Sequence, residues 1–250
     1  MDYDVVIVGG GPSGLSAAIK LAQLFKEKNQ EKSICVLEKS AEIGGHILSG
    51  NVFETTALDE LIPDWKEKNA PLNVPVTKDA IKFLLNDKLS IPVPSFLMPT
   101  MKNHGNYIIS LANLCRWLAE QAESLGVDIF PGFPAAEIIY KEGKVAGVIT
   151  GDMGKDSKGN EKDSFQPGME IFANESTVFA EGCRGNLGKQ LIKKFELDKG
   201  KDPQHYGIGF KEIWEVDNEH HSEGLVMHTN GWPLPDDTPG GSYMLSLIHI

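Results

Sequence analysis

A glycine-rich stretch near the start of the sequence carries its strongest chemical signal. Residues 9–14 read GGGPSG, which fits the pattern G-x-G-x-x-G. In this pattern Gly9 permits a tight turn, Gly11 lets the backbone approach a pyrophosphate, and Gly14 lets a helix pack closely on a strand. A helix that begins in the stretch would add free N–H groups and the positive end of its dipole. The stretch therefore predicts a phosphate site for a dinucleotide.

The elements that must position this stretch are predicted on both sides of it. Residues 3–8 form an apolar run rich in β-branched side chains, as expected for a buried parallel strand, and from residue 13 apolar side chains recur at helical spacing. A second apolar run, at 34–37, leads to Glu38, about 24 residues after the last glycine. A carboxylate there can accept hydrogen bonds from both ribose hydroxyls of an adenosine. A glycine-rich turn without a ligand is the competing interpretation, and this context argues against it.

The residues after Glu38 favour FAD over NAD. Residues 38–50 read EKSAEIGGHILSG, which resembles the E-K-x-x-x-x-G-G segment of flavoproteins of the glutathione-reductase and hydroxylase-like families. This resemblance implies that Gly44 and Gly45 pass close to the pyrophosphate of the flavin. The position of the segment near the N-terminus also favours FAD, because such enzymes bind FAD first.

Further elements are predicted along the middle of the chain. They are a helix over 106–124, a strand at 127–130, a hairpin of 137–140 and 145–150 that turns at Glu142-Gly143, and a polar surface loop over 151–168. In related flavoproteins the backbone after this helix and strand contacts the adenine, which places that contact at Ala135 or Ala136.

Residues 177–185 read TVFAEGCRG and resemble the A-x-G-x-x-[SG] segment that closes the nucleotide domain of these flavoproteins. Glu181 stands where those families usually have Asp. A plain strand–turn–helix connection is the alternative interpretation.

Composition excludes several classes of protein. The formal net charge is −11, from 35 acidic and 24 basic residues, which argues against nucleic-acid binding because phosphates attract Lys and Arg.

The three cysteines, Cys35, Cys115 and Cys183, form no CxxC pair, as is typical of reduced intracellular thiols. A four-iron cluster normally needs four thiolates, so we expect this chain to ligate none alone. We also expect no targeting peptide, because the first strand starts at residue 3, and no membrane span, because no apolar run approaches about 20 residues.

Four stretches together resemble the electron-transfer-flavoprotein:ubiquinone oxidoreductase family. They lie at 44–50, 103–108, 206–214 and 228–233, and Gly240-Gly241-Ser242 follows them. The resemblance implies one FAD, a four-iron (4Fe-4S) cluster whose ligands lie outside this chain, electron-transfer flavoprotein as donor and ubiquinone as acceptor. The predicted cofactor contacts are Gly9, Gly11, Pro12, Ser13, Gly14, Glu38, Lys39, Gly44, Gly45, His46, Ser49, Ala136, Glu181 and Gly182, and the predicted quinone contacts are Gly240 and Gly241. No catalytic acid–base pair and no metal ligand is predicted.

Residues 91–101, IPVPSFLMPTM, are apolar and contain three prolines, which exclude a regular helix. A loop packed on its own domain is one interpretation. The family resemblance favours the other, peripheral membrane contact, because a quinone with an isoprenoid tail enters from lipid. It implies location at the cytoplasmic face of a bacterial inner membrane or at the mitochondrial inner membrane.

The predicted fold class is α/β, a Rossmann-like FAD-binding domain with a doubly wound parallel sheet and an inserted antiparallel-sheet region for the quinone. The FAD domain spans 1–50 and 106–200, and the quinone and membrane-facing region spans 51–105 and 201–250. Residues 245–250 depart from the family pattern, so we expect an incomplete enzyme. Alternatives are a FAD-dependent reductase of the geranylgeranyl-reductase or nitrogen-fixation electron-carrier type, a nucleotide-binding interaction module without redox chemistry, and a soluble FAD hydroxylase.

Overall fold

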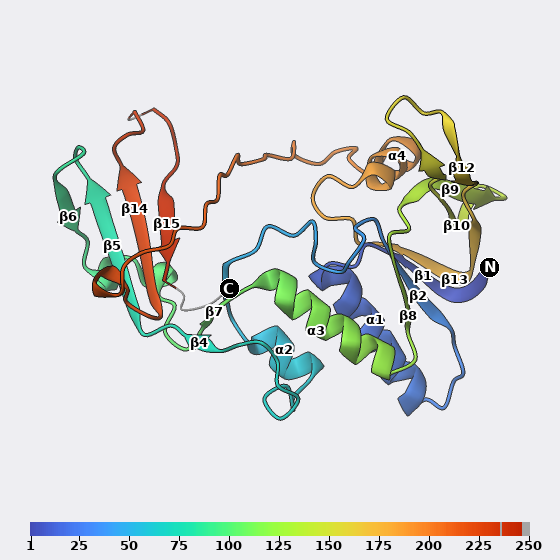
Figure 1. Cartoon of the computed structure of the whole chain (residues 1–250), viewed down its shortest axis with the longest axis horizontal. Coiled ribbons are helices and arrows are strands. Elements are labelled where there is room, and N and C mark those ends of the chain that lie inside the picture. Colours follow the sequence, from blue (N-terminus) through green and yellow to red (C-terminus); the bar gives the residue numbers. More distant parts are fainter. Residues whose placement is uncertain (236, 247–250) are drawn as a thin grey trace. The chain divides into compact units, whose positions relative to one another are not determined.

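The computed structural model describes residues 1–235 and 237–246, and the chain divides into two compact units. Unit 1 comprises Met1–Ile47 and Cys115–Gly209, and unit 2 comprises Leu48–Leu114 and the chain from Phe210 onward (Figure 1). The assignment of FAD to one part of the chain and quinone to the other stays a prediction. The predicted departure from the family pattern over 245–250 falls mostly on 247–250, which lie outside the described residues.

Unit 1 is built on a six-stranded sheet in the order β8-β2-β1-β13-β10-β9. Its strands are β1 (Asp2–Val8), β2 (Ile34–Glu38), β8 (Asp128–Pro131), β9 (Ala135–Lys141), β10 (Lys144–Thr150) and β13 (Glu170–Phe179). The first four strands in this order run parallel, whereas β10 pairs antiparallel with both β13 and β9. The predicted α/β fold with its parallel Rossmann-like core is confirmed.

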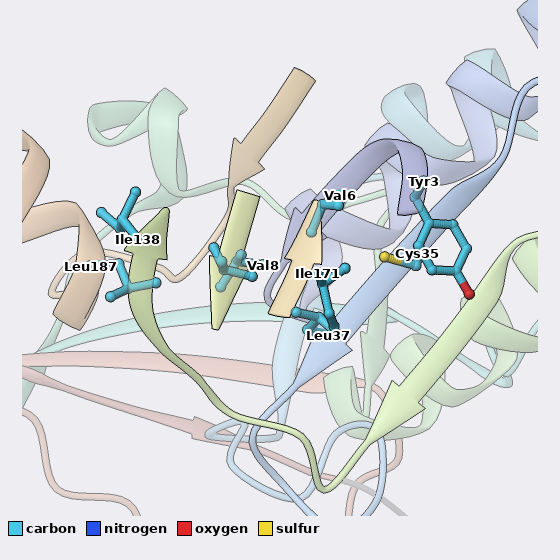
Figure 2. Packing of buried hydrophobic residues seen from close by; sticks show 9 residues of the cluster. Tyr3, Val6, Val8, Cys35, Leu37, Ile138, Ile171 and Leu187 are labelled. Carbon is cyan, nitrogen blue, oxygen red and sulfur yellow. The ribbon is translucent and has the colours of Figure 1, made fainter. Parts of the chain in front are cut away.

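The two central parallel strands, β1 and β2, are buried on both faces, which explains why their sequences are almost continuously apolar. Figure 2 shows one face, where Val6 and Val8 of β1 pack with Leu37 of β2 and with Leu187 from the helix α4 (Asn186–Phe195). On the other face, Ile7 is fully buried, and the helix α1 (Pro12–Glu27) contacts β1 and β2.

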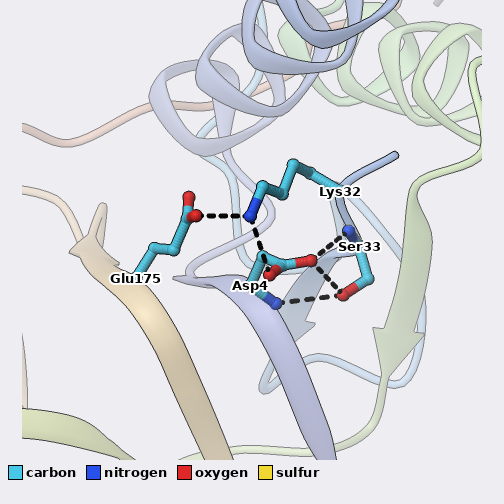
Figure 3. A network of polar contacts seen from close by, with 4 residues as sticks. All are labelled: Asp4, Lys32, Ser33 and Glu175. Atoms are coloured by element: carbon cyan, nitrogen blue, oxygen red, sulfur yellow. Dashed lines mark hydrogen bonds and ion pairs between the residues drawn. The ribbon is translucent and has the colours of Figure 1, made fainter. Parts of the chain in front are cut away.

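A polar network joins β1, the residues just before β2, and β13 (Figure 3). The Asp4 carboxylate accepts hydrogen bonds from the N–H of Ser33 (2.8 Å) and from its hydroxyl (3.0 Å). Lys32 lies 2.5 Å from Glu175 and 3.5 Å from Asp4. The Ser33 N–H is the main cause that lowers the pKa of Asp4.

Two predicted elements differ in the structure. The helix predicted over 106–124 begins only at Leu111, as α3 (Leu111–Ser124), and the residues before it form the strand β7 (Tyr107–Ile109). The β-branched Ile108 and Ile109 favour a strand, and Ser110 separates the two elements because its hydroxyl accepts the N–H of Asn113 (3.3 Å).

The polar stretch predicted as a surface loop contains a short hairpin. Its strands are β11 (Met153–Lys155) and β12 (Glu161–Gln166), which pair antiparallel. The Asp156 carboxylate turns the chain by accepting the N–H groups of Lys158 and Asn160. The predicted β9–β10 hairpin is confirmed, with its turn residues Glu142 and Gly143 at positive φ angles of 50° and 77°.

Unit 2 contains two sheets and the short helix α2 (Thr56–Leu61). One sheet has the order β15-β14-β5-β6, from β15 (Ser242–Leu245), β14 (Leu225–Gly231), β5 (Lys78–Leu84) and β6 (Ser90–Pro92); the other has the order β3-β7-β4, from β3 (Asn51–Phe53), β7 and β4 (Val74–Pro75). The three-stranded sheet is antiparallel, as predicted for this region. The four-stranded sheet is mixed, because its central pair, β5 and β14, runs parallel.

Candidate functional site

The turn between β1 and α1 needs glycine at two positions for steric reasons. Gly9 has a φ angle of +112°, and a Cβ placed on it would lie 2.4 Å from the carbonyl oxygen of Ala180. A Cβ on Gly14 would lie 2.0 Å from the carbonyl oxygen of Gly9, so the helix packs directly on the turn. A Cβ on Gly11 would meet nothing within 4 Å. The three glycines therefore divide into two that close the turn and one that faces open space.

The amino end of α1 has the character of an anion site. Gly11 occupies its N-cap position and offers no side-chain hydrogen bond, Pro12 is its first residue, and no acidic residue lies in its first turn. The first amides of a helix have no partner within the helix, and the helix dipole adds positive charge. These residues fit a pyrophosphate group, with Ser13 at the start of the helix and the open side of Gly11 beside it.

Glu38, at the end of β2, lies directly beside this turn. One carboxylate oxygen accepts the N–H of Gly10 (2.9 Å), and the other accepts the N–H of Ser40 (2.8 Å). These bonds fix the orientation of the carboxylate. An ionised carboxylate has about four acceptor positions, so two remain for the hydroxyls of a ribose.

The segment after β2 folds back on itself next to the same turn. The Ser40 side chain is buried, and a Cβ on Gly45 would lie 2.3 Å from its hydroxyl oxygen. Gly44 has a positive φ angle of 85°. Ile43 reaches the turn, because a Cβ on Gly10 would lie 2.7 Å from its Cδ1. Of the other predicted contacts in this segment, the side chains of Lys39 and His46 are exposed.

Two residues that sequence reasoning missed also lie beside Glu38. The N–H of Gly132 donates to the carbonyl of Ser40 (2.6 Å), and the N–H of Phe133 donates to the carbonyl of Glu38 (2.9 Å). The predicted adenine contact, Ala136, is exposed on the edge strand β9. One signal could have identified these two residues in the sequence: Gly132 and Phe133 directly follow the predicted strand that forms β8, and β8 pairs with β2.

The second glycine turn, between β13 and α4, is arranged differently. Gly182 has a φ angle of +80° and faces open space. The Glu181 carboxylate accepts the N–H groups of Leu187 (3.2 Å) and Gly188 (2.8 Å). It therefore binds the first turn of α4, and whether it also contacts a cofactor stays a prediction.

The remaining predicted contacts lie in unit 2. The hydroxyls of Ser49 and Ser110 are 2.7 Å apart. A Cβ on Gly241 would lie 2.5 Å from the carbonyl oxygen of Thr229, and one on Gly240 would lie 2.8 Å from Cδ1 of Leu234. Both glycines are thus in close contact with the chain, although they have ordinary φ angles.

Residues 91–101 form the strand end of β6 and two short 3-10 turns, Ser95–Leu97 and Pro99–Met101. Three of their large apolar side chains are exposed: Ile91 (49%), Phe96 (73%) and Leu97 (59%). Within 1–235 and 237–246, no helix is long and apolar enough to cross a membrane. The same part of the chain contains no group of three His, Cys, Asp or Glu side chains placed to hold a metal ion.

Comparison with known proteins gives matches over nearly the whole chain. The electron transfer flavoprotein-ubiquinone oxidoreductase of Pseudomonas aeruginosa is 59% identical over 250 residues, which cover 99% of this chain and 45% of that protein. This chain belongs to the electron transfer flavoprotein-ubiquinone oxidoreductase family. The mitochondrial member from Arabidopsis thaliana is 50% identical over 248 residues, 98% of this chain and 38% of that protein. The chain thus spans less than half the length of these two relatives.

Two family models match separate parts of the chain. The model of the ubiquinone-binding region of this family, ETF-QO, matches residues 206–249, and a model described as an NAD(P)-binding Rossmann-like domain matches residues 7–63. Among solved structures, a geranylgeranyl bacteriochlorophyll reductase-like protein from Thermoplasma acidophilum superposes with a TM-score of 0.53 at 18% identity, covering 92% of this chain and 51% of that one. That likeness shows the shared fold.

Proposed function

We propose that this chain provides the FAD-binding and ubiquinone-binding parts of an oxidoreductase that takes electrons from reduced electron-transfer flavoprotein and passes them to ubiquinone. The observation that carries the proposal is the combination of two features in one chain. One is an open phosphate turn with Glu38 beside it. The other is the match of residues 206–249 to the ubiquinone-binding region of the family.

FAD is the dinucleotide that the residues support best. The N-terminus of α1 and the open side of Gly11 would hold the pyrophosphate, Glu38 would hold the ribose, and the backbone at Gly44 and Gly45 would pass along the phosphates. The family model that matches residues 7–63 is described as an NAD(P)-binding Rossmann-like domain. The glycine pair after Glu38, however, is typical of flavoproteins. When bound, FAD would supply a centre that accepts one or two electrons.

The remaining parts of the reaction involve partners and surfaces. The backbone at Gly240 and Gly241 would contact the quinone ring, and the exposed side chains of Ile91, Phe96 and Leu97 would reach the membrane interface. Such contacts would hold the protein peripherally on the cytoplasmic face of a bacterial inner membrane or on the mitochondrial inner membrane. The four-iron cluster would be ligated outside this chain.

The test uses the complete reading frame that contains this chain, expressed and purified in detergent. We expect a flavin spectrum, a reducible four-iron EPR signal, and reduction of ubiquinone by reduced electron-transfer flavoprotein. Flavin without a cluster, bleached by reduced nicotinamide, would instead favour a reductase of the geranylgeranyl-reductase type. A protein without bound flavin would favour an interaction module.

A further inference from the structure

One face of the four-stranded sheet in unit 2 changes from apolar to polar along β14. Val226 of β14 and Leu245 of β15 lie directly opposite each other, and both pack in a cluster with Ile108. The next pair along these strands whose side chains point to the same face is His228 and Tyr243, because opposite residues share a face and every second residue returns to it. This pair follows immediately where the apolar cluster ends.

His228 carries a buried polar atom without a partner. Its Nε2 atom is enclosed by the protein, and no hydrogen-bond partner for it exists among the residues that the structure describes. An unsatisfied buried polar group destabilises a protein. Such a group calls for a ligand or a water molecule.

A cation lies over the second member of the pair. The Lys211 ammonium is 5.5 Å from the centroid of the Tyr243 ring, and it donates to the carbonyl of Ser49 (2.7 Å) and to that of Gly50. Within the described part of the chain Lys211 has no carboxylate partner. An ammonium has three donors, so one donor and an unneutralised charge remain beside Tyr243.

The polar pair lies between the apolar cluster and the predicted quinone contacts. Gly241 lies two residues before Tyr243, just before β15 begins. The backbone of Gly241 is in close contact with Thr229 of β14. Lys211, His228 and Tyr243 all fall within the match to the ubiquinone-binding region. Two hydrogen-bonding groups and one aromatic ring therefore share one face next to these glycines.

We propose that His228 and Lys211 are the side chains that hydrogen-bond the head group of the quinone, which reaches the enclosed His228 Nε2 by displacing the groups that cover it, and that Tyr243 forms a wall against the quinone ring. A quinone head group is a flat, apolar ring with carbonyl oxygens that only accept hydrogen bonds. A ring N–H and an ammonium supply the donors for such oxygens, and an aromatic side chain supplies the apolar surface. This inference rests on the proposed function and names the residues of that site.

The test measures equilibrium binding of decylubiquinone, a short-chain ubiquinone, to the protein from the complete reading frame by isothermal titration calorimetry. We expect His228→Phe and Lys211→Met each to raise Kd by about tenfold, the effect of one buried hydrogen bond. His228→Gln and Lys211→Arg, which keep a donor, should stay within about threefold of the unsubstituted protein. His220→Asn replaces an exposed histidine outside this face and serves as the matched control.

Thermal unfolding separates binding from a purely structural role. His228→Phe removes an unsatisfied polar atom, so we expect its Tm to be unchanged or higher while binding weakens. An unchanged Kd in both His228→Phe and Lys211→Met, with binding by the unsubstituted protein intact, would overturn this inference alone. Absence of any decylubiquinone binding by the unsubstituted protein would overturn the proposed quinone function and this inference together.

Discussion

Unit 1 contains two strand–glycine–helix turns that share a sequence pattern but differ in their chemistry. The strands before them, β1 and β13, are parallel neighbours, with Val8 opposite Phe179 at their ends. The helix after each turn begins at a glycine without a side-chain cap, Gly11 for α1 and Gly185 for α4. In the second turn, however, the Glu181 carboxylate accepts N–H groups at the amino end of α4. A strand–glycine–helix pattern therefore indicates a phosphate site only where no side chain of the protein already satisfies the helix amides.

The largest expected difference between the two turns is at the third residue of each helix, Gly14 in α1 and Gly188 in α4. In Gly14→Ala the new Cβ would lie 2.0 Å from the Gly9 carbonyl oxygen, so backbone must move. We expect a loss of about 3 kcal/mol of unfolding free energy, or failure to fold, together with loss of FAD. Denaturant unfolding and flavin content measure both effects.

The matched variant is Gly188→Ala. Its Cβ would lie 3.6 Å from the Glu181 carboxylate, an ordinary contact. Because alanine favours helix over glycine, we expect its stability to be unchanged or higher by up to about 1 kcal/mol. Equal behaviour of the two variants would contradict the contrast between the turns.

Gly11→Ala separates the cofactor from the fold. Gly11 has an ordinary backbone conformation, with φ −84° and ψ −176°, and a Cβ there meets only open space. We expect stability to fall by no more than about 1 kcal/mol, while FAD affinity falls by about tenfold or more because the methyl group fills the space that a pyrophosphate needs. Reconstitution of the apoprotein with FAD, followed by flavin fluorescence, measures the affinity. Unchanged affinity in Gly11→Ala would remove this turn from the cofactor site.

Glu181→Gln tests what closes the second turn. The substitution keeps one acceptor but removes the negative charge from the amino end of α4. We expect the free energy of unfolding to fall by about 1 kcal/mol, as for the loss of a helix cap. FAD affinity is measured in parallel. If FAD affinity falls by more than this loss of stability explains, Glu181 contacts the cofactor directly.

Sequence patterns predicted the features that depend on neighbours along the chain. The strand before Gly9, the helix after it and the acidic end of β2 follow from local apolar periodicity and a short motif. The parallel pairing of β5 with β14 joins Lys78 to Leu225, and no local pattern encodes a partner that distant. The bond from Lys211 to the carbonyl of Ser49 is unpredictable for the same reason.

The hydrogen bonds from the helix α4 to the Glu181 carboxylate could not be predicted from the sequence for a different physical reason. The carboxylate reaches Leu187 and Gly188 only because Gly182 adopts a positive φ angle and returns the chain. A glycine can adopt either sign of φ, so the sequence leaves the direction of the turn open. The start of α3 is a separate case: the β-branched Ile108 and Ile109 favour a strand, but three residues are too few to give a strand pattern in the sequence.

The smallest expected effect concerns the reactivity of the three cysteine thiols, which differs between the buried sheet and the second glycine turn. Burial is the main cause that raises the pKa of the Cys35 and Cys115 thiols to about 12, whereas Cys183 is exposed in the second turn, next to Gly182. We expect N-ethylmaleimide at pH 8 to label Cys183 alone in the folded protein and all three cysteines in urea, as read by mass spectrometry.

Because the raised pKa values of Cys35 and Cys115 belong to the folded state, the stability that these two thiols contribute is complete below pH 9 and is lost as the pH rises from 9 towards 12. Rapid labelling of Cys35 in the folded protein would contradict the burial of this thiol and would show that the sheet opens at β2.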